Sequence, residues 1–162
     1  MKKILSRFFI FFGSVLLPIT VICQTGSWDD VKVMISNRSD VRRIFQKTDD
    51  GSIFDVFSIK EGTVTISYSF GKCTCKVNSG WNIPDDTVVE LKFTPLTEVY
   101  FSMLKVNLKQ FKKIKESPDV PDIITYINSR EGVRYVIQPD GLVSTIAYFP
   151  ATKYDELRCP SN

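Results

Sequence analysis

The apolar positions of this chain follow strand periodicity in a first group of three segments. Between residues 63 and 70 apolar and polar side chains alternate, and Val64, Ile66, Tyr68 and Phe70 share one face. A period of two is typical of a strand with one buried face. Residues 53–59 and 86–93 complete the first group.

A second group of predicted strands lies nearer the C-terminus, at residues 123–128, 133–138 and 142–149. Short turns rich in Gly, Asp and Pro separate them, at 129–132 and 139–141. Short turns favour antiparallel neighbours.

A helix is expected before each group of strands. Residues 40–47 form the first, with Ser39 as its N-cap and Asp40 in its first turn. Its apolar face comprises Val41, Ile44 and Phe45. Arg42 and Arg43 are expected to point outward.

The second expected helix starts near Asn107 and ends before the prolines of residues 117–121. Its apolar positions are Leu108, Phe111 and Ile114, and its basic positions are Lys109, Lys112, Lys113 and Lys115. The lysines fit either the solvated face of a core helix or a surface for anionic lipid or an acidic partner.

The two groups also echo one another in sequence. Residues 41–44, 53–57 and 60–62 match residues 111–114, 123–127 and 130–132 at an offset of 70. Residues 93–97 match 148–152 at an offset of 55, so the first copy carries 70 − 55 = 15 additional residues. An internal repeat of this kind indicates that the fold is built from two copies of one structural unit.

These patterns together predict an α+β fold. Two αβββ repeat units, about 28–97 and 98–159 with an insertion at about 71–85, form a largely antiparallel sheet that two short helices cover on one face. Without a leader at residues 1–23, residues 24–162 suit a single domain.

A helix followed by a β-meander, twice in tandem, resembles the beta-lactamase inhibitor protein fold and the small lipoprotein of the barrel-assembly machinery. Residues 39–45 are similar to the short helix that opens each unit in those families. Residues 80–88 also look like segments of uncharacterised exported bacterial proteins. The resemblance implies a binding role by analogy.

Residues 1–23 are typical of an export signal. Lys2, Lys3 and Arg7 precede an apolar run, and Cys23 supplies a small residue for cleavage before Gln24. The alternatives are an uncleaved anchor and a lipidated Cys23. We therefore expect a secreted or periplasmic protein, with a membrane role only if the leader stays or Cys23 is lipidated.

Loss of the leader changes the charge balance. The whole chain has a formal net charge of +3, from 21 basic and 18 acidic residues. The three leader charges are all basic, so 21 − 3 = 18 basic residues remain against 18 acidic ones. A neutral chain gives no global attraction to nucleic acid, and none is expected as a partner.

Three cysteines remain after cleavage: Cys73, Cys75 and Cys159. In an oxidising compartment we expect Cys159 to pair with Cys73 or Cys75, leaving the other free. A direct Cys73–Cys75 redox pair is the alternative, although it lacks the two-residue spacer of thioredoxin-like sites.

The chain contains no histidine, which excludes Ser-His-Asp and Cys-His catalysis and His-ligated metals. The acidic pairs at 29–30, 49–50 and 85–86 each point to opposite faces of an extended chain, so they make poor chelates. No cofactor and no metal site is expected.

A large aromatic residue, Trp81, lies in the insertion with Asn82, Asp85 and Asp86 nearby. Such a residue either anchors an interface or folds back over the sheet edge. The resulting hypothesis is a non-enzymatic binding or envelope-associated module whose partner is another protein or an envelope component. The alternative is a small extracytoplasmic enzyme, either an Asp/Glu hydrolase or a Cys redox protein.

Overall fold

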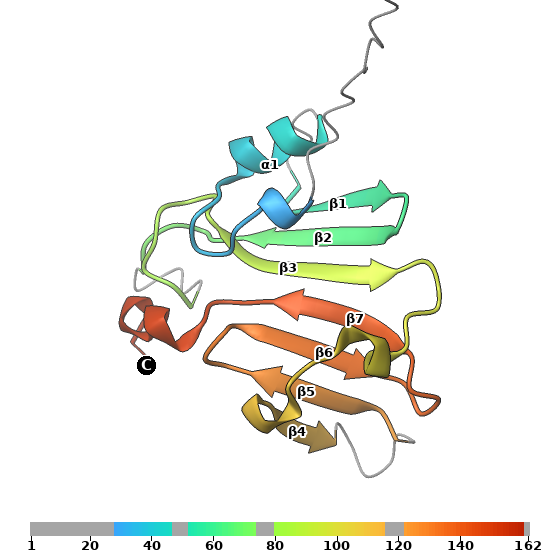
Figure 1. The fold of residues 1–162 in the computed structure, drawn as a ribbon. Helices are drawn as coiled ribbons and strands as arrows, with labels where there is room; N and C mark the ends of the chain where they lie inside the picture. The colour runs from blue at the N-terminus through green and yellow to red at the C-terminus, as the bar shows by residue number, and fades with distance from the viewer. Residues whose placement is uncertain (1–27, 47–51, 74–79, 116–121, 161–162) are drawn as a thin grey trace, which may run out of the picture.

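The computed structural model describes residues 28–46, 52–73, 80–115 and 122–160, which form one seven-stranded antiparallel sheet (Figure 1). The strand order is β1-β2-β3-β7-β6-β5-β4. The strands are β1 (Phe54–Ile59), β2 (Gly62–Tyr68), β3 (Val88–Pro95), β4 (Lys112–Lys115), β5 (Ile124–Asn128), β6 (Val133–Ile137) and β7 (Val143–Tyr148). The predicted α+β class is confirmed. The predicted leader, residues 1–23, lies outside the described residues.

Two three-stranded meanders meet at the centre of this sheet. β1-β2-β3 forms one and β5-β6-β7 the other, and β3 pairs with β7 through Leu91 opposite Tyr148 and Phe93 opposite Ile146. The strands lie at the positions that the echo aligns, β1 with β5 and β2 with β6. That the two halves are copies of one repeated unit stays a prediction.

The first predicted helix is present as α1 (Arg38–Phe45), but Asn37 caps it and Ser39 does not. Asn37 has an extended backbone, and its side chain accepts a hydrogen bond from the Asp40 N–H while Asp40 accepts from the Asn37 N–H. This reciprocal capping box satisfies two otherwise unpaired donors. Ser39 lies in the first turn and donates to Asn37.

The second predicted helix is wrong. Residues Phe101–Leu104 and Leu108–Gln110 form short 3-10 turns, η2 and η3, and the lysine-rich stretch after them is strand β4. The three-residue spacing of the apolar side chains matches a 3-10 period, as the Phe111 N–H bond to the Leu108 carbonyl shows. β4 is the sheet edge, where lysines discourage pairing with another chain.

One face of the first half holds the main core. Val64, Ile66 and Tyr68 of β2 pack there with residues of β3 and with Val41 of α1. Over the second half, the same face is covered by aromatic side chains: Phe101 stacks on Tyr126 with ring centroids 4.9 Å apart. The sheet's other face carries the alternate residues, among them Lys92 and Arg134, which share Glu90 as an ion-pair partner.

Within the described part of the chain, no helix is long and apolar enough to cross a membrane.

Candidate functional site

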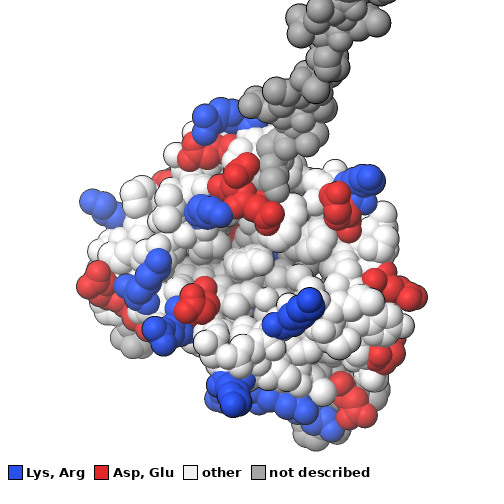
Figure 2. All heavy atoms as spheres, viewed as in Figure 1, with Lys and Arg blue, Asp and Glu red and all other residues white. Residues whose placement is uncertain are grey.

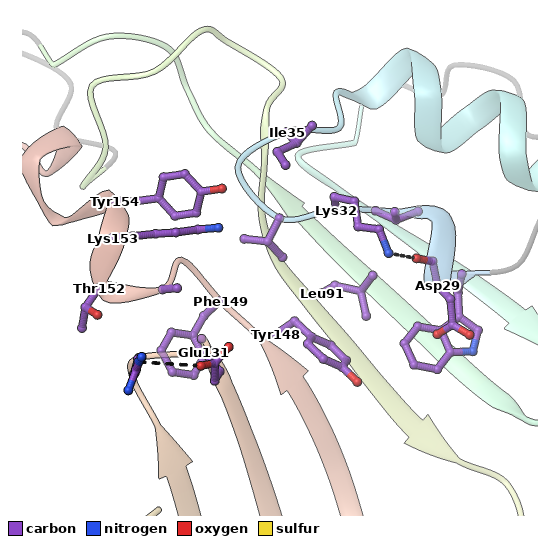
Figure 3. Close-up of a pocket in the computed structure, with 16 residues that line it drawn as sticks. Asp29, Lys32, Ile35, Leu91, Glu131, Tyr148, Phe149, Thr152, Lys153 and Tyr154 are labelled. Carbon is purple, nitrogen blue, oxygen red and sulfur yellow. Dashed lines mark hydrogen bonds and ion pairs between the residues drawn. The ribbon is translucent and has the colours of Figure 1, made fainter. Parts of the chain in front are cut away.

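A cleft of about 860 Å³ opens on the covered side of the sheet where the two halves meet (Figure 3). Leu91 of β3 and Tyr148 of β7, partners across the central strand pair, both line it. One wall is the N-terminal segment 28–35, and the other combines the β5–β6 turn with residues 149–154. No local pattern in the sequence links these segments.

Backbone hydrogen bonds hold the N-terminal wall at the start of β3. The Met34 N–H donates to the Val88 carbonyl and the Val88 N–H to the Ser36 carbonyl. The short 3-10 turn η1 (Trp28–Asp30) places Trp28 on the strands, where its ring stacks on Phe93 with centroids 5.2 Å apart. An aromatic stack and paired backbone groups give this wall a fixed position.

The opposite wall depends on a close backbone approach at Gly132. The Phe149 N–H donates to the Gly132 carbonyl, and the Thr152 N–H donates to the Ser129 carbonyl. Gly132 has a φ of +68°, and a Cβ there would lie 2.1 Å from the Phe149 oxygen. Only glycine fits, and this contact fixes the start of the 3-10 helix η4 (Thr152–Leu157) beside the cleft.

The cleft combines apolar and charged side chains. Val31, 6% exposed, and Leu91, 1% exposed, are apolar groups beneath its charged rim. Burial raises the pKa of the Tyr148 phenol, and the nearby Tyr135 and Asp29 add to the rise. A tyrosine phenol is protonated at physiological pH, so Tyr148 adds an uncharged aromatic surface to the cleft.

The charged side chains of the cleft come from both walls. They are Asp29 and Lys32 on the N-terminal segment, Arg130 and Glu131 on the β5–β6 turn, and Lys153 on η4. Arg130 lies 3.9 Å from Glu131, and the Lys32 ammonium donates to the Asp29 backbone carbonyl. In the sequence, Asp29 is recognisable only as half of the acidic pair at residues 29–30.

The cysteine that pairs with Cys159 is Cys73, with a Cα–Cα distance of 5.7 Å. Cys75 lies outside the described residues. The bond ties the C-terminal tail to the segment after β2, and two backbone bonds join the same regions: the Asn82 N–H donates to the Leu157 carbonyl and the Cys159 N–H to the Gly80 carbonyl.

Trp81 is 9% exposed and packs under Arg158, whose guanidinium carbon lies 4.4 Å from the ring centroid. This burial favours the packing alternative over an exposed anchor. Asn82, Asp85 and Asp86 are exposed. Their contact with a partner stays a prediction, and these four residues do not line the main cleft.

A buried charged cluster lies under α1, separate from the cleft. Asp55 is fully buried in β1, accepts a 2.7 Å hydrogen bond from the Tyr68 hydroxyl, and lies 3.7 Å from Arg42. The prediction that Arg42 points outward is wrong, because the arginine reaches this carboxylate; Arg43, whose side chain is 78% exposed, does point outward.

The same cluster extends to the β2–β3 loop. The Arg38 guanidinium lies 4.2 Å from the Tyr68 ring centroid and forms a 2.8 Å ion pair with Asp86. Burial, with the hydrogen bond and charge of Asp55, raises the pKa of Tyr68 above its ordinary value. Since Asp55 has no exposed surface, the cluster joins α1 to the sheet rather than presenting a reactive group.

Within the described ranges, no group of three or more His, Cys, Asp or Glu side chains is placed to hold a metal ion.

The fold and cleft define an α+β protein built on a single antiparallel sheet. No protein-family description and no curated protein sequence matches the chain. The chain is similar to a solved structure, that of a DUF4309 family protein (YjgB) from Bacillus subtilis subsp. subtilis str. 168. The two share 15% identity over 75% of this chain and 82% of that one, with a TM-score of 0.49. A likeness of this extent carries no conclusion about function.

Proposed function

We propose that this protein is an exported, non-enzymatic binding module and that the cleft between its halves is the binding site. The observation that carries the proposal is the cleft of about 860 Å³ on the central strands. Binding sites for small molecules usually span about 300–1,000 Å³ and combine apolar linings with a few polar groups. The cleft has both properties.

The residues available for chemistry support binding over catalysis. Histidine, the commonest general base at neutral pH, is absent from the chain. The cleft carboxylates Asp29 and Glu131 come from different walls, and Glu131 lies beside Arg130 (Figure 3). Cys73 and Cys159 are joined in a disulfide, so neither supplies a thiolate nucleophile.

The proposed location rests on two features of the chain. Residues 1–23 have the pattern of an export signal. The Cys73–Cys159 disulfide suits an oxidising compartment outside the cytoplasm. The resemblance of residues 39–45 to the short helix that opens each unit of the beta-lactamase inhibitor protein and the small barrel-assembly lipoprotein supports a binding role in the same setting by analogy.

Binding of a neutral apolar probe tests the cleft. N-phenyl-1-naphthylamine is a dye whose fluorescence rises when an apolar site takes it up. Ile35, at the cleft, and Met103, on η2 away from it, are both 69% exposed, so tryptophan at either position replaces an equally exposed side chain. Ile35→Trp narrows the cleft, and Met103→Trp is the matched control.

We expect saturable dye binding to the wild type and to Met103→Trp. Ile35→Trp should weaken it by about tenfold or more, equivalent to about 1.4 kcal/mol of binding free energy. Equal binding by all three proteins, or no saturable binding to the wild type, would remove the cleft as the site.

A further inference from the structure

The rim of the cleft carries an excess of positive charge. Its basic residues are Lys32, Arg130 and Lys153 and its acidic ones Asp29 and Glu131, three against two. Glu131 has Arg130 at 3.9 Å, so this acid is already next to a base. In Figure 2, basic and acidic side chains border an uncharged hollow on the face that carries the cleft.

Two polar side chains extend from η4 across the cleft toward the N-terminal wall. In Figure 3 the Lys153 ammonium and the Tyr154 hydroxyl point the same way, toward the side of Ile35 and Lys32. The Lys153 Nζ atom lies 4.9 Å from the Tyr154 ring centroid. Among the described residues, no carboxylate forms an ion pair with Lys153.

Lys32 lies on the facing wall, and its ammonium points toward Asp29 (Figure 3). It donates to the Asp29 backbone carbonyl, an acceptor with no formal charge. The positive charge of Lys32 is therefore not cancelled by that hydrogen bond. The Lys153 ammonium and the Tyr154 hydroxyl, neighbouring donors on η4, suit one anionic group of a ligand.

The lining between these walls suits the remainder of such a ligand. Val31, Leu91 and Phe149 are apolar, and Tyr148 presents an uncharged aromatic ring. Taking up an apolar body here would remove further apolar surface from water. Polar groups at the rim and apolar groups below them match a molecule with two unlike ends.

We propose that the cleft binds an amphipathic anion, with its apolar body on Leu91 and Tyr148 and its anionic group held by Lys153 and Tyr154. This inference rests on the proposed function, because it names the ligand class of the same cleft. An acyl chain with a carboxylate and an apolar C-terminal peptide end share this chemistry.

Two dyes that differ by a single anionic group test the inference. 8-Anilinonaphthalene-1-sulfonate carries the aromatic body of N-phenyl-1-naphthylamine with a sulfonate added. We expect the sulfonated dye to bind the wild type roughly tenfold more tightly, because charge-assisted hydrogen bonds exceed neutral ones. Equal or weaker binding of the sulfonated dye would overturn the anion proposal.

Variants of the η4 residues separate the anionic group from the apolar body. Lys153→Gln should lose most of the tighter binding of the sulfonated dye relative to the neutral dye. Tyr154→Phe should lose a smaller part of it, and both variants should bind the neutral dye as the wild type does. Lys109→Gln, at an exposed lysine of η3 that does not line the cleft, is the matched control and should change neither. An unchanged preference in Lys153→Gln would contradict the assignment.

The outcomes distinguish the two proposals. Neutral-dye binding that Ile35→Trp blocks, without a preference for the sulfonated dye, keeps the binding cleft and removes the anion. No saturable binding of either dye removes both.

Competition experiments identify the chemical class of the natural ligand. Displacement of the sulfonated dye by decanoate alone assigns an acyl carboxylate, and displacement by N-acetylphenylalanine alone assigns a peptide end. Displacement by neither at millimolar concentration contradicts the proposal.

Discussion

The two halves of the sheet share a strand pattern but differ in what covers them. In the first half α1 and the 28–35 segment pack on β1-β2-β3, and all the largest fully buried side chains lie there: Ile66, Leu91, Val41, Val64, Val88 and Asp55. In the second half two 3-10 turns cover the strands through aromatic contacts, and its largest aliphatic core residues keep some exposure, 5% for Ile137 and for Val143.

This difference shows that the strand pattern alone does not decide how much apolar surface a half buries. A helix adds a continuous apolar stripe, whereas 3-10 turns add single side chains such as Phe101 and Phe111. The first half should therefore carry most of the stability, and the second half should open locally at lower free energy. The cleft lies where the two covers meet.

Removing the carboxylate under α1 should break the first half most severely. Asp55→Ala removes the buried carboxylate that faces Arg42 and accepts a hydrogen bond from the Tyr68 hydroxyl, which we expect to cost about 3–5 kcal/mol of unfolding free energy. Urea denaturation measures the loss. Glu98→Ala, at an exposed position, should stay within about 0.5 kcal/mol of the wild type. A loss below about 1 kcal/mol for Asp55→Ala would contradict the role given to the cluster.

Truncating one isoleucine in each half tests the comparison directly. Ile66 has no exposed surface and Ile137 is 5% exposed. Within the range of about 2–5 kcal/mol for such truncations, Ile66→Ala should fall near the top and Ile137→Ala near the bottom. Denaturation curves recorded under one set of conditions give the loss of unfolding free energy for each variant. Equal losses, or the reverse order, would show that the two covers bury their strands equally well.

Breaking the disulfide should have the next largest effect. The Cys73–Cys159 bond closes a separation of 86 residues and joins the tail of the second half to the first. Cys159→Ser should lower stability by roughly 2–4 kcal/mol and the melting temperature by several degrees. Cys73→Ser should match it and Cys75→Ser should not. Should Cys75→Ser reproduce the loss while Cys73→Ser does not, the pairing is wrong.

The smallest effect concerns alkaline pH. Because the folded-state pKa of Tyr68 is raised, the unfolded chain releases this proton first, near pH 10, and stability falls as pH rises further. Tyr68→Phe should reduce that slope by up to about 1.4 kcal/mol per pH unit. At neutral pH the same substitution should lower the unfolding free energy by about 1 kcal/mol, because the hydrogen bond to Asp55 is lost. Urea denaturation between pH 8 and 11 measures both. Identical alkaline slopes would show that Tyr68 ionises normally.

Local patterns in the sequence were sufficient to predict six of the strands and one helix. They failed at residues 108–114 because a spacing of three residues fits a 3-10 turn as well as a helix, and because the sheet edge accepted 112–115 as a strand. They also failed at Arg42, whose partner lies on another element. The available signal was Asp55, an acid on the same face of its strand as Phe57.

The cleft could not be predicted because its walls come from opposite ends of the domain. Residues 28–35 and 148–154 become neighbours only when β3 pairs with β7. The cysteines gave two possible partners for Cys159, and the choice of Cys73 depends on where the segment after β2 runs. Long-range pairing, which local periodicity does not encode, decides both.

Chemical-shift mapping with 8-anilinonaphthalene-1-sulfonate tests the central claim most directly. Amide spectra of the wild-type protein should change at residues 28–35, Leu91, 130–132 and 148–154, and the changes should shrink in Ile35→Trp. Changes confined to the other face of the sheet, around Lys92 and Arg134, would contradict the claim that the cleft between the two halves is the binding site.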